Sequence, residues 1–269
     1  MPTLTELGKA APGMVLDTEN DWGKDGCFVG AGGQTFPAST PWHQVPPVLP
    51  NNGKAAWRTV IMVNGIMTDV ALQASDMQRM ANSGYKVVGI HNDTQGMLVD
   101  LAQCVGDKLE LDMANNHATA TTAQVVADLL QADETPLLVG HSQGALVVSN
   151  ALGRVQDGLI ECGVTPEEAA RRLEKLQVTT LGGASWTFPE GPKYCHVVNF
   201  MDVVPMATGV GVISGLSDTV HLFGQVNAPH HLPQVQDGLG NYLARVVDRS
   251  VHGPQDIYIP KLEEIAPTR

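Results

Sequence analysis

The stretch Pro136-Leu137-Leu138-Val139-Gly140-His141-Ser142-Gln143-Gly144-Ala145 joins a short apolar run to a segment of helical composition that continues to Leu152. This order predicts a strand that turns sharply into a helix. A residue at such a turn is held in a strained backbone conformation with its side chain exposed, and glycines two positions before and after it leave room. The pattern therefore predicts that Ser142 is a nucleophile.

Outward from this stretch, from Trp57 onward, short β-branched runs alternate with longer helical patterns, which is typical of a mainly parallel sheet covered by helices. The near-continuous Val, Ile and Leu content suits strands that are buried on both faces. The predicted strands are 59–63, 86–91, 136–140, 177–181, 196–200 and 219–223. The predicted helices are 71–83, 96–108, 118–131, 145–156, 166–175 and 239–248. The fold class is therefore α/β, a doubly wound, mainly parallel sheet flanked by helices, whose ligands bind beyond the carboxyl ends of the strands.

The first 56 residues differ from the rest in composition and in hydrophobic periodicity. They are rich in Gly, Pro, Asn and other polar residues and show no sustained periodicity. We expect residues 1–56 to form an irregular N-terminal extension packed on a single domain, residues 57–269. A chain of 269 residues with 43% hydrophobic content is of the right size for one such core.

Charge and hydropathy exclude several classes of function. The formal net charge of −12 disfavours binding to nucleic acid and constitutive docking on anionic membranes. The segment from Met1 to Ala10 lacks a basic stretch followed by an apolar one, and no 18 consecutive residues are apolar. We therefore expect no signal peptide, no integral membrane segment, and a location in the cytoplasm or outside the cell by a leaderless route. No common metal or phosphate motif occurs, so we expect neither a metal nor a cofactor.

A second informative segment is His196-Val197-Val198-Asn199-Phe200-Met201-Asp202-Val203-Val204-Pro205, an apolar run that ends in N-x-x-D-x-V-P. Together with the Ser142 turn, it resembles the α/β-hydrolase superfamily, lipase and esterase branch, over about residues 57–247. The segment itself looks like the one that carries the catalytic aspartate in class 3 lipases. The resemblance implies that Asp202 is the acid that orients a histidine. The alternative is an aspartate that caps the turn after a strand.

The resemblance also implies a catalytic histidine after the last strand. Asn227-Ala228-Pro229-His230-His231-Leu232-Pro233 offers two adjacent candidates. His231 precedes a leucine, as the catalytic histidine of class 3 lipases often does, and is favoured. His230 fits the H-x-hydrophobic pattern found elsewhere in the superfamily and stays open. No positional argument singles out His252, and His141 is expected to pack beneath the turn.

An oxyanion hole needs backbone N–H groups at the point where negative charge develops. The resemblance implies the amide of Gln143, directly after the nucleophile, as one donor. It implies that the second comes from the turn Asn64-Gly65-Ile66-Met67, which stands where relatives carry His-Gly; Ile66 is the first choice and Met67 the next. The alternative is an ordinary turn between a strand and a helix, in which glycine supplies only conformational freedom.

These residues together predict a serine hydrolase that cleaves carboxylic esters through an acyl-enzyme, with a small-molecule or lipid ester as substrate. Analogy with lipases favours lipid-like or other apolar acyl esters and transient contact with lipid. Two alternatives stay open: a non-catalytic α/β-hydrolase scaffold that acts as a binding module, and a thioesterase or acyltransferase that uses the same triad.

Overall fold

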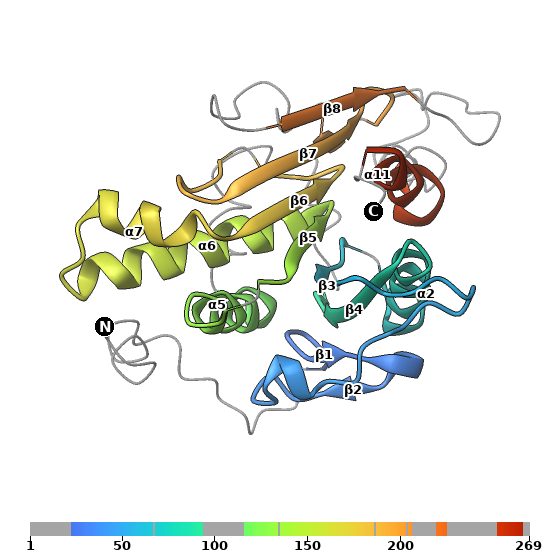
Figure 1. The fold of residues 1–269 in the computed structure, drawn as a ribbon, viewed down its shortest axis with the longest axis horizontal. Helices are drawn as coiled ribbons and strands as arrows, with labels where there is room; N and C mark the ends of the chain where they lie inside the picture. Colours follow the sequence, from blue (N-terminus) through green and yellow to red (C-terminus); the bar gives the residue numbers. More distant parts are fainter. Residues whose placement is uncertain are drawn as a thin grey trace, which may run out of the picture.

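A computed structural model describes residues 23–66, 68–93, 116–133, 135–185, 187–202, 204–205, 219–224 and 252–265. Among these residues, eight strands form one sheet in the order β2-β1-β4-β3-β5-β6-β7-β8 (Figure 1). The strands are β1 (Phe28–Val29), β2 (Thr35–Phe36), β3 (Arg58–Val63), β4 (Tyr85–Ile90), β5 (Leu137–His141), β6 (Gln177–Leu181), β7 (Lys193–Asn199) and β8 (Thr219–Phe223). Neighbouring strands from β4 to β8 are parallel, and β1 is antiparallel to both β2 and β4. The predicted mainly parallel sheet is confirmed.

Four of the predicted helices are present with bounds shifted by a few residues. The helical elements of the described residues are η1 (Ala31–Gly33), η2 (Trp42–Gln44), α2 (Val70–Ala81), α5 (His117–Leu129), α6 (Gln143–Glu161), α7 (Pro166–Leu173), the π-helical turn η4 (Pro254–Tyr258) and α11 (Ile259–Ile265). The predicted helices 96–108 and 239–248 lie outside the described residues. Within the described ranges, no helix has the length and apolar character needed to cross a membrane.

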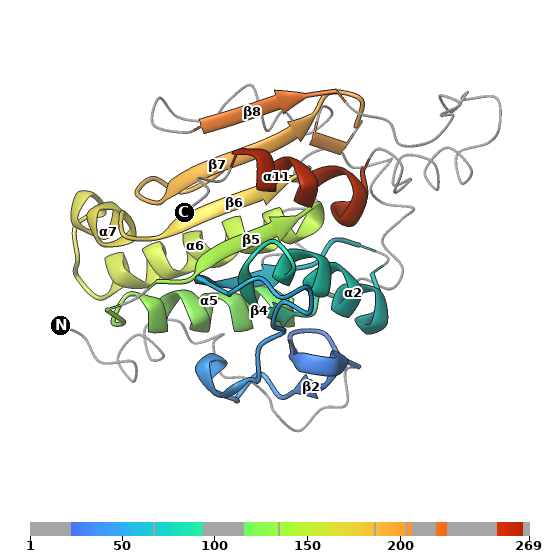
Figure 2. The same ribbon diagram turned by 45° about the vertical axis from the view of Figure 1, so that its right-hand side comes forward.

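Helices cover both faces of the sheet, as a doubly wound fold requires (Figures 1 and 2). On one face, α5, α6 and α7 pack on inward-facing residues such as Ile61 and Leu138. On the other face, α2, η4 and α11 pack on residues such as Met62 and Val139. Successive residues of β3 and β5 thus belong to opposite cores, which explains why these strands read as continuous apolar runs.

Part of the predicted N-terminal extension joins the sheet. Phe28 and Val29 of β1 lie opposite Ile90 and Gly89 of β4, and Val48 forms an isolated bridge with Val87. The described part of this segment therefore covers the edge of β4 with backbone hydrogen bonds. The boundary at residue 56 stays a prediction.

The parallel strands bring the sequence candidates to one edge of the sheet. Asn64 follows β3, Asn92 comes two residues after β4, Ser142 follows β5, and Asp202 comes three residues after β7. The carboxyl ends of parallel strands lie at the same edge, which is where ligands bind in open α/β sheets.

A buried histidine in β7 makes the stability of the fold depend on pH. His196 is fully buried, with its ring 4.9 Å from that of Phe188 and its Nδ1 2.8 Å from Thr180 Oγ1. Burial lowers the pKa of His196 to about 4 from its ordinary value of 6.5. Between these two values the unfolded chain binds a proton that the folded chain does not, so stability falls as pH decreases.

We expect the free energy of unfolding to lose about 3 kcal/mol from this group between pH 6.5 and 4. Urea unfolding at several pH values measures the loss. In the His196→Phe variant the decline should be smaller by that amount, and an equal decline in both proteins would contradict this account.

Candidate active site

The turn between β5 and α6 holds Ser142 in a strained conformation. Ser142 has φ 53° and ψ −124°, and it is the only non-glycine residue with positive φ in the described part of the chain. L-residues avoid this region because Cβ approaches the backbone, so the surrounding structure must impose it. The strand, turn and helix expected around Ser142 are therefore present.

Three glycines give this turn the room it needs. A Cβ on Gly140 would lie 2.6 Å from Ala145 Cα, and one on Gly144 would lie 2.3 Å from the Val63 carbonyl oxygen. A Cβ on Gly65 would lie 2.7 Å from Ser142 Cβ. The two glycines of the pentapeptide thus allow α6 to approach β5 and β3, and Gly65 allows the β3 turn to reach the serine.

Backbone hydrogen bonds fix the strained residue from both sides. The Ser142 N–H donates to the Leu181 carbonyl at 3.0 Å, and the Ser142 carbonyl accepts from the N–H groups of Ala145 and Ala184, each at 3.0 Å. Ser142 is only 3% exposed, so the exposed side chain expected at this turn is buried in the structure. Its position is therefore set by the end of β6 as well as by its own helix.

Asp202 lies fully buried after β7. Its N–H donates to the Asn199 carbonyl at 2.9 Å, and its Oδ1 accepts from the Val204 N–H at 3.0 Å. Its Oδ2 lies 2.5 Å from His252 Nδ1 and also accepts a hydrogen bond from the Tyr258 hydroxyl. The turn-capping role that was the alternative reading of Asp202 is present, but only on Oδ1. Oδ2 holds an imidazole.

The histidine paired with Asp202 is His252, to which the sequence analysis assigned no role. Its ring is buried, and its Nε2 has no hydrogen-bond partner among the described residues. A ring whose Nδ1–H donates to a carboxylate carries its lone pair on Nε2, which is the state required of a general base.

His252 also lies beside the serine turn. Its ring centroid is 4.8 Å from that of His141, the residue before Ser142, and its carbonyl oxygen is 2.8 Å from His141 Nε2. His141 is thus held by a backbone carbonyl, as expected for a residue packed beneath the turn. The acid, the imidazole and the serine turn meet in one buried cluster.

The predicted histidines His231 and His230 lie outside the described residues. Two signals in the sequence are compatible with His252, although the first applies to His230 and His231 as well. His252 follows the last strand in chain order, as the resemblance requires, and it precedes Gly253-Pro254, where a new helical segment begins. Tyr258, the other side chain on Asp202, was also missed.

A buried amide network supports the predicted oxyanion turn. Asn64 Nδ2 donates to the carbonyls of Gly65 at 2.8 Å and Asn92 at 2.9 Å, and Asn64 Oδ1 accepts from the Asn92 N–H at 2.9 Å. Asn92 Nδ2 in turn donates to Gln143 Oε1 at 3.0 Å. The network therefore ties the β3 turn to Gln143, the first residue of α6.

Two of the three predicted donors, Ile66 and Gln143, lie in the described part of the chain. The Ile66 carbonyl accepts from Thr68 Oγ1 at 3.2 Å. Gln143 opens α6, and the first turn of a helix carries the positive end of its dipole. The third predicted donor, Met67, lies outside the described residues.

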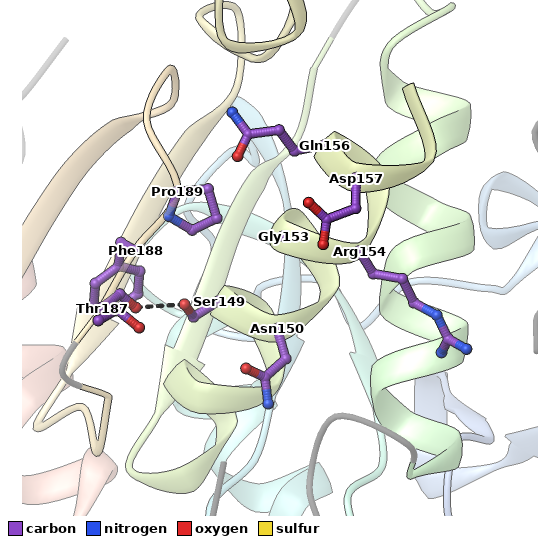
Figure 3. A pocket seen from close by; sticks show the side chains of 9 residues that line it. All are labelled: Ser149, Asn150, Gly153, Arg154, Gln156, Asp157, Thr187, Phe188 and Pro189. Carbon is purple, nitrogen blue, oxygen red and sulfur yellow. Dashed lines mark hydrogen bonds between the residues drawn. The ribbon is translucent and has the colours of Figure 1, made fainter. Parts of the chain in front are cut away.

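Two surface cavities lie away from this cluster. One, of about 540 Å³, is formed by α6 and residues 187–189 (Figure 3). There Ser149 Oγ donates to the Thr187 carbonyl at 2.5 Å, and Ser149 is already about 10 Å along the helix from Ser142. The other, of about 620 Å³, lies between residues 38–43 and α5. Neither cavity is lined by a predicted catalytic residue, so we assign neither a role in catalysis.

Among the described residues, no group of three His, Cys, Asp or Glu side chains is arranged to hold a metal ion.

The chain matches no protein-family model and no curated protein sequence. Among solved structures, it is similar to a candidate dienelactone hydrolase from Klebsiella pneumoniae, with a TM-score of 0.38 and 12% identity over 74% of this chain and 90% of that one. It is also similar to esterase PE8, with a TM-score of 0.35 and 18% identity over 73% of this chain and 94% of that one. The α/β-hydrolase fold is indicated by the sheet and by the strained serine between β5 and α6.

Proposed function

We propose that this protein is a serine hydrolase of carboxylic esters in which Ser142 is the nucleophile, His252 the general base and Asp202 the orienting acid. The observation that carries the proposal is the His252 ring. Its Nδ1 lies 2.5 Å from Asp202 Oδ2, and its buried Nε2 has no partner among the described residues. A buried polar atom without a partner costs free energy, so its retention beside a strained serine favours a catalytic role.

The proposed base is His252 and not His231 or His230, the two histidines expected from the sequence. Both oxygens of Asp202 already accept hydrogen bonds, Oδ1 from the Val204 N–H and Oδ2 from His252 and Tyr258. Three donors thus hold the buried carboxylate, and one of them is already an imidazole. The arrangement therefore favours His252 as the base.

In the proposed reaction, Ser142 Oγ attacks the ester carbonyl carbon while His252 Nε2 takes the hydroxyl proton. The negative charge that develops on the carbonyl oxygen is stabilised by the backbone N–H groups of Gln143 and Ile66. The proton then passes from Nε2 to the leaving alkoxide, and the C–O bond of the ester breaks. Water activated by His252 releases the acid from Ser142, and Asp202 stabilises the imidazolium in both steps.

The proposed substrates are esters with lipid-like or other apolar acyl groups. Within the α/β-hydrolases, the N-x-x-D-x-V-P segment around Asp202 favours the class 3 lipase branch. Phe200 and Met201, immediately before the acid, are 53% and 36% exposed. Exposed apolar side chains next to the triad support binding of an apolar group.

The test is turnover of p-nitrophenyl butyrate and p-nitrophenyl octanoate by the purified protein, with and without prior treatment with a fluorophosphonate. We expect hydrolysis of both esters and its complete loss after treatment. A folded protein that neither hydrolyses these esters nor reacts with the fluorophosphonate would contradict the proposal and favour a non-catalytic scaffold. Faster turnover of the matching acyl-CoA would instead indicate a thioesterase.

A further inference from the structure

Tyr258 touches the proposed triad from the face of the sheet opposite α6. It is the last residue of η4, a π-helical turn, and it is fully buried. Its hydroxyl donates to Asp202 Oδ2 and lies 3.4 Å from the Asn199 N–H. Single π-helical turns are rare and often occur at functional sites, where they re-aim one side chain.

The chain makes room for this hydroxyl. Gly182, directly after β6, has φ 55°, and a Cβ there would lie 2.6 Å from the Tyr258 hydroxyl oxygen. Any other residue at position 182 would push the phenol away from Asp202. The contact is therefore supported by two separate segments of the chain, the end of β6 and the η4 turn.

Tyr258 and His252 share a single carboxylate oxygen. Oδ2 accepts from both the phenol and the imidazole, whereas Oδ1 accepts from a backbone N–H. Burial, and next the nearby Asp202 charge, raise the pKa of Tyr258 well above its ordinary value, so the phenol keeps its proton throughout the working range of an enzyme. Each donor that binds a carboxylate oxygen withdraws charge from it and weakens what it offers to the next.

We infer that Tyr258 is a positioning residue of the triad, whose hydroxyl fixes the Asp202 carboxylate and reduces the negative charge that Oδ2 presents to the His252 ring. The inference rests on the proposed function. It assigns to Tyr258 a share in how Asp202 Oδ2 holds the His252 ring. Among the described residues, the titratable groups that contact this ring are Asp202, His141 and Tyr258 itself, and His141 is held by the His252 carbonyl.

The experiment compares the wild type with Tyr258→Phe and measures kcat and KM for p-nitrophenyl butyrate from pH 5 to 9. Without the phenol, Oδ2 offers more charge to His252 and stabilises its protonated form. We expect the acidic limb of kcat/KM to move to higher pH by about 0.5–1 unit, with KM little changed. Tyr194→Phe is the matched control, because Tyr194 donates to the Pro189 carbonyl and touches no triad residue among those described. Its acidic limb should stay at the wild-type position.

A second substitution keeps the shape of the side chain and reverses the sign of the effect. Tyr258→3,5-difluorotyrosine is a stronger donor, so the acidic limb should move to lower pH. The inference is overturned if the acidic limb stays at the wild-type pH in folded Tyr258→Phe or in the fluorinated protein. Turnover by the wild type would leave the proposed function standing in that case. If the wild type has no turnover, the proposed function itself fails.

Discussion

Replacing His252 by glutamine should lower kcat/KM for p-nitrophenyl butyrate by about 10⁴-fold or more. A glutamine amide can still donate to Asp202 Oδ2, so the buried carboxylate keeps a partner and the fold should persist. It cannot accept the proton of Ser142, and removing the base of such a triad leaves only the contribution of the oxyanion donors and of binding. The rate of p-nitrophenol release measures the change in kcat/KM, and circular dichroism checks that the variant is folded.

His43→Gln is the control for this experiment. His43 is exposed, its ring contacts that of Trp42, and it takes part in none of the contacts described around Ser142, Asp202 and His252, so its replacement should leave turnover unchanged. The account of the triad fails if His252→Gln retains most of its activity. If His231→Gln or His230→Gln abolishes turnover instead, the base is the histidine predicted from the sequence.

Ser142→Ala should abolish detectable acyl-enzyme formation and lower kcat by about 10⁴-fold or more, because the other hydroxyl of the described cluster, that of Tyr258, donates its proton to Asp202 Oδ2. Alanine keeps Cβ, so the contacts of Gly65 and the backbone bonds to Leu181 and Ala184 remain. Stability should therefore stay within about 0.5 kcal/mol of the wild type. Burst kinetics with p-nitrophenyl butyrate and thermal unfolding measure the two quantities.

Two further substitutions separate chemistry from strain. Ser149→Ala removes a hydroxyl from the same helix that donates to the Thr187 carbonyl, and it should retain full turnover. Ser142→Gly should be as inactive as Ser142→Ala but more stable by about 1 kcal/mol or more, because glycine adopts a φ of 53° without strain. Retained activity in either Ser142 variant would contradict the assigned nucleophile.

The sheet was predictable because its parallel strands are buried on both faces. All six predicted strands are present, and the pattern Val60-Ile61-Met62-Val63 is apolar throughout because alternate residues enter two different cores. The strands β1 and β2 were not predicted. Each has two residues and exists only through pairing with a neighbour, so neither leaves a periodic signal in the sequence.

The helical segment after residue 252 was missed for a local reason. Pro254 and Pro260 interrupt it, and proline inside a pattern normally ends a helix. Here Pro254 occupies the first turn of η4, where its missing N–H costs nothing. The segment is held by tertiary packing of Tyr258, Ile259 and Leu262 on the sheet, which no local pattern records.

Some residues of the candidate site could be predicted from the sequence and others could not. The spacing of the glycines predicted the Ser142 turn, because at each of these positions backbone atoms come too close to leave room for a Cβ. The histidine that contacts Asp202 is determined by how the segment that begins at His252 packs on the sheet. The local sequence around His230 and His231 contains no information about that packing. His252 is joined to Asp202 across 50 residues of sequence by one 2.5 Å contact.

The most direct test of the central claim is the rate and site of fluorophosphonate labelling, read by mass spectrometry of peptides from the wild type, His252→Gln and His43→Gln proteins. The account predicts a single adduct on Ser142, formed at the same rate in the wild type and His43→Gln and at least about 100-fold more slowly in His252→Gln. An adduct on any other residue, or labelling of His252→Gln at the wild-type rate, would contradict it.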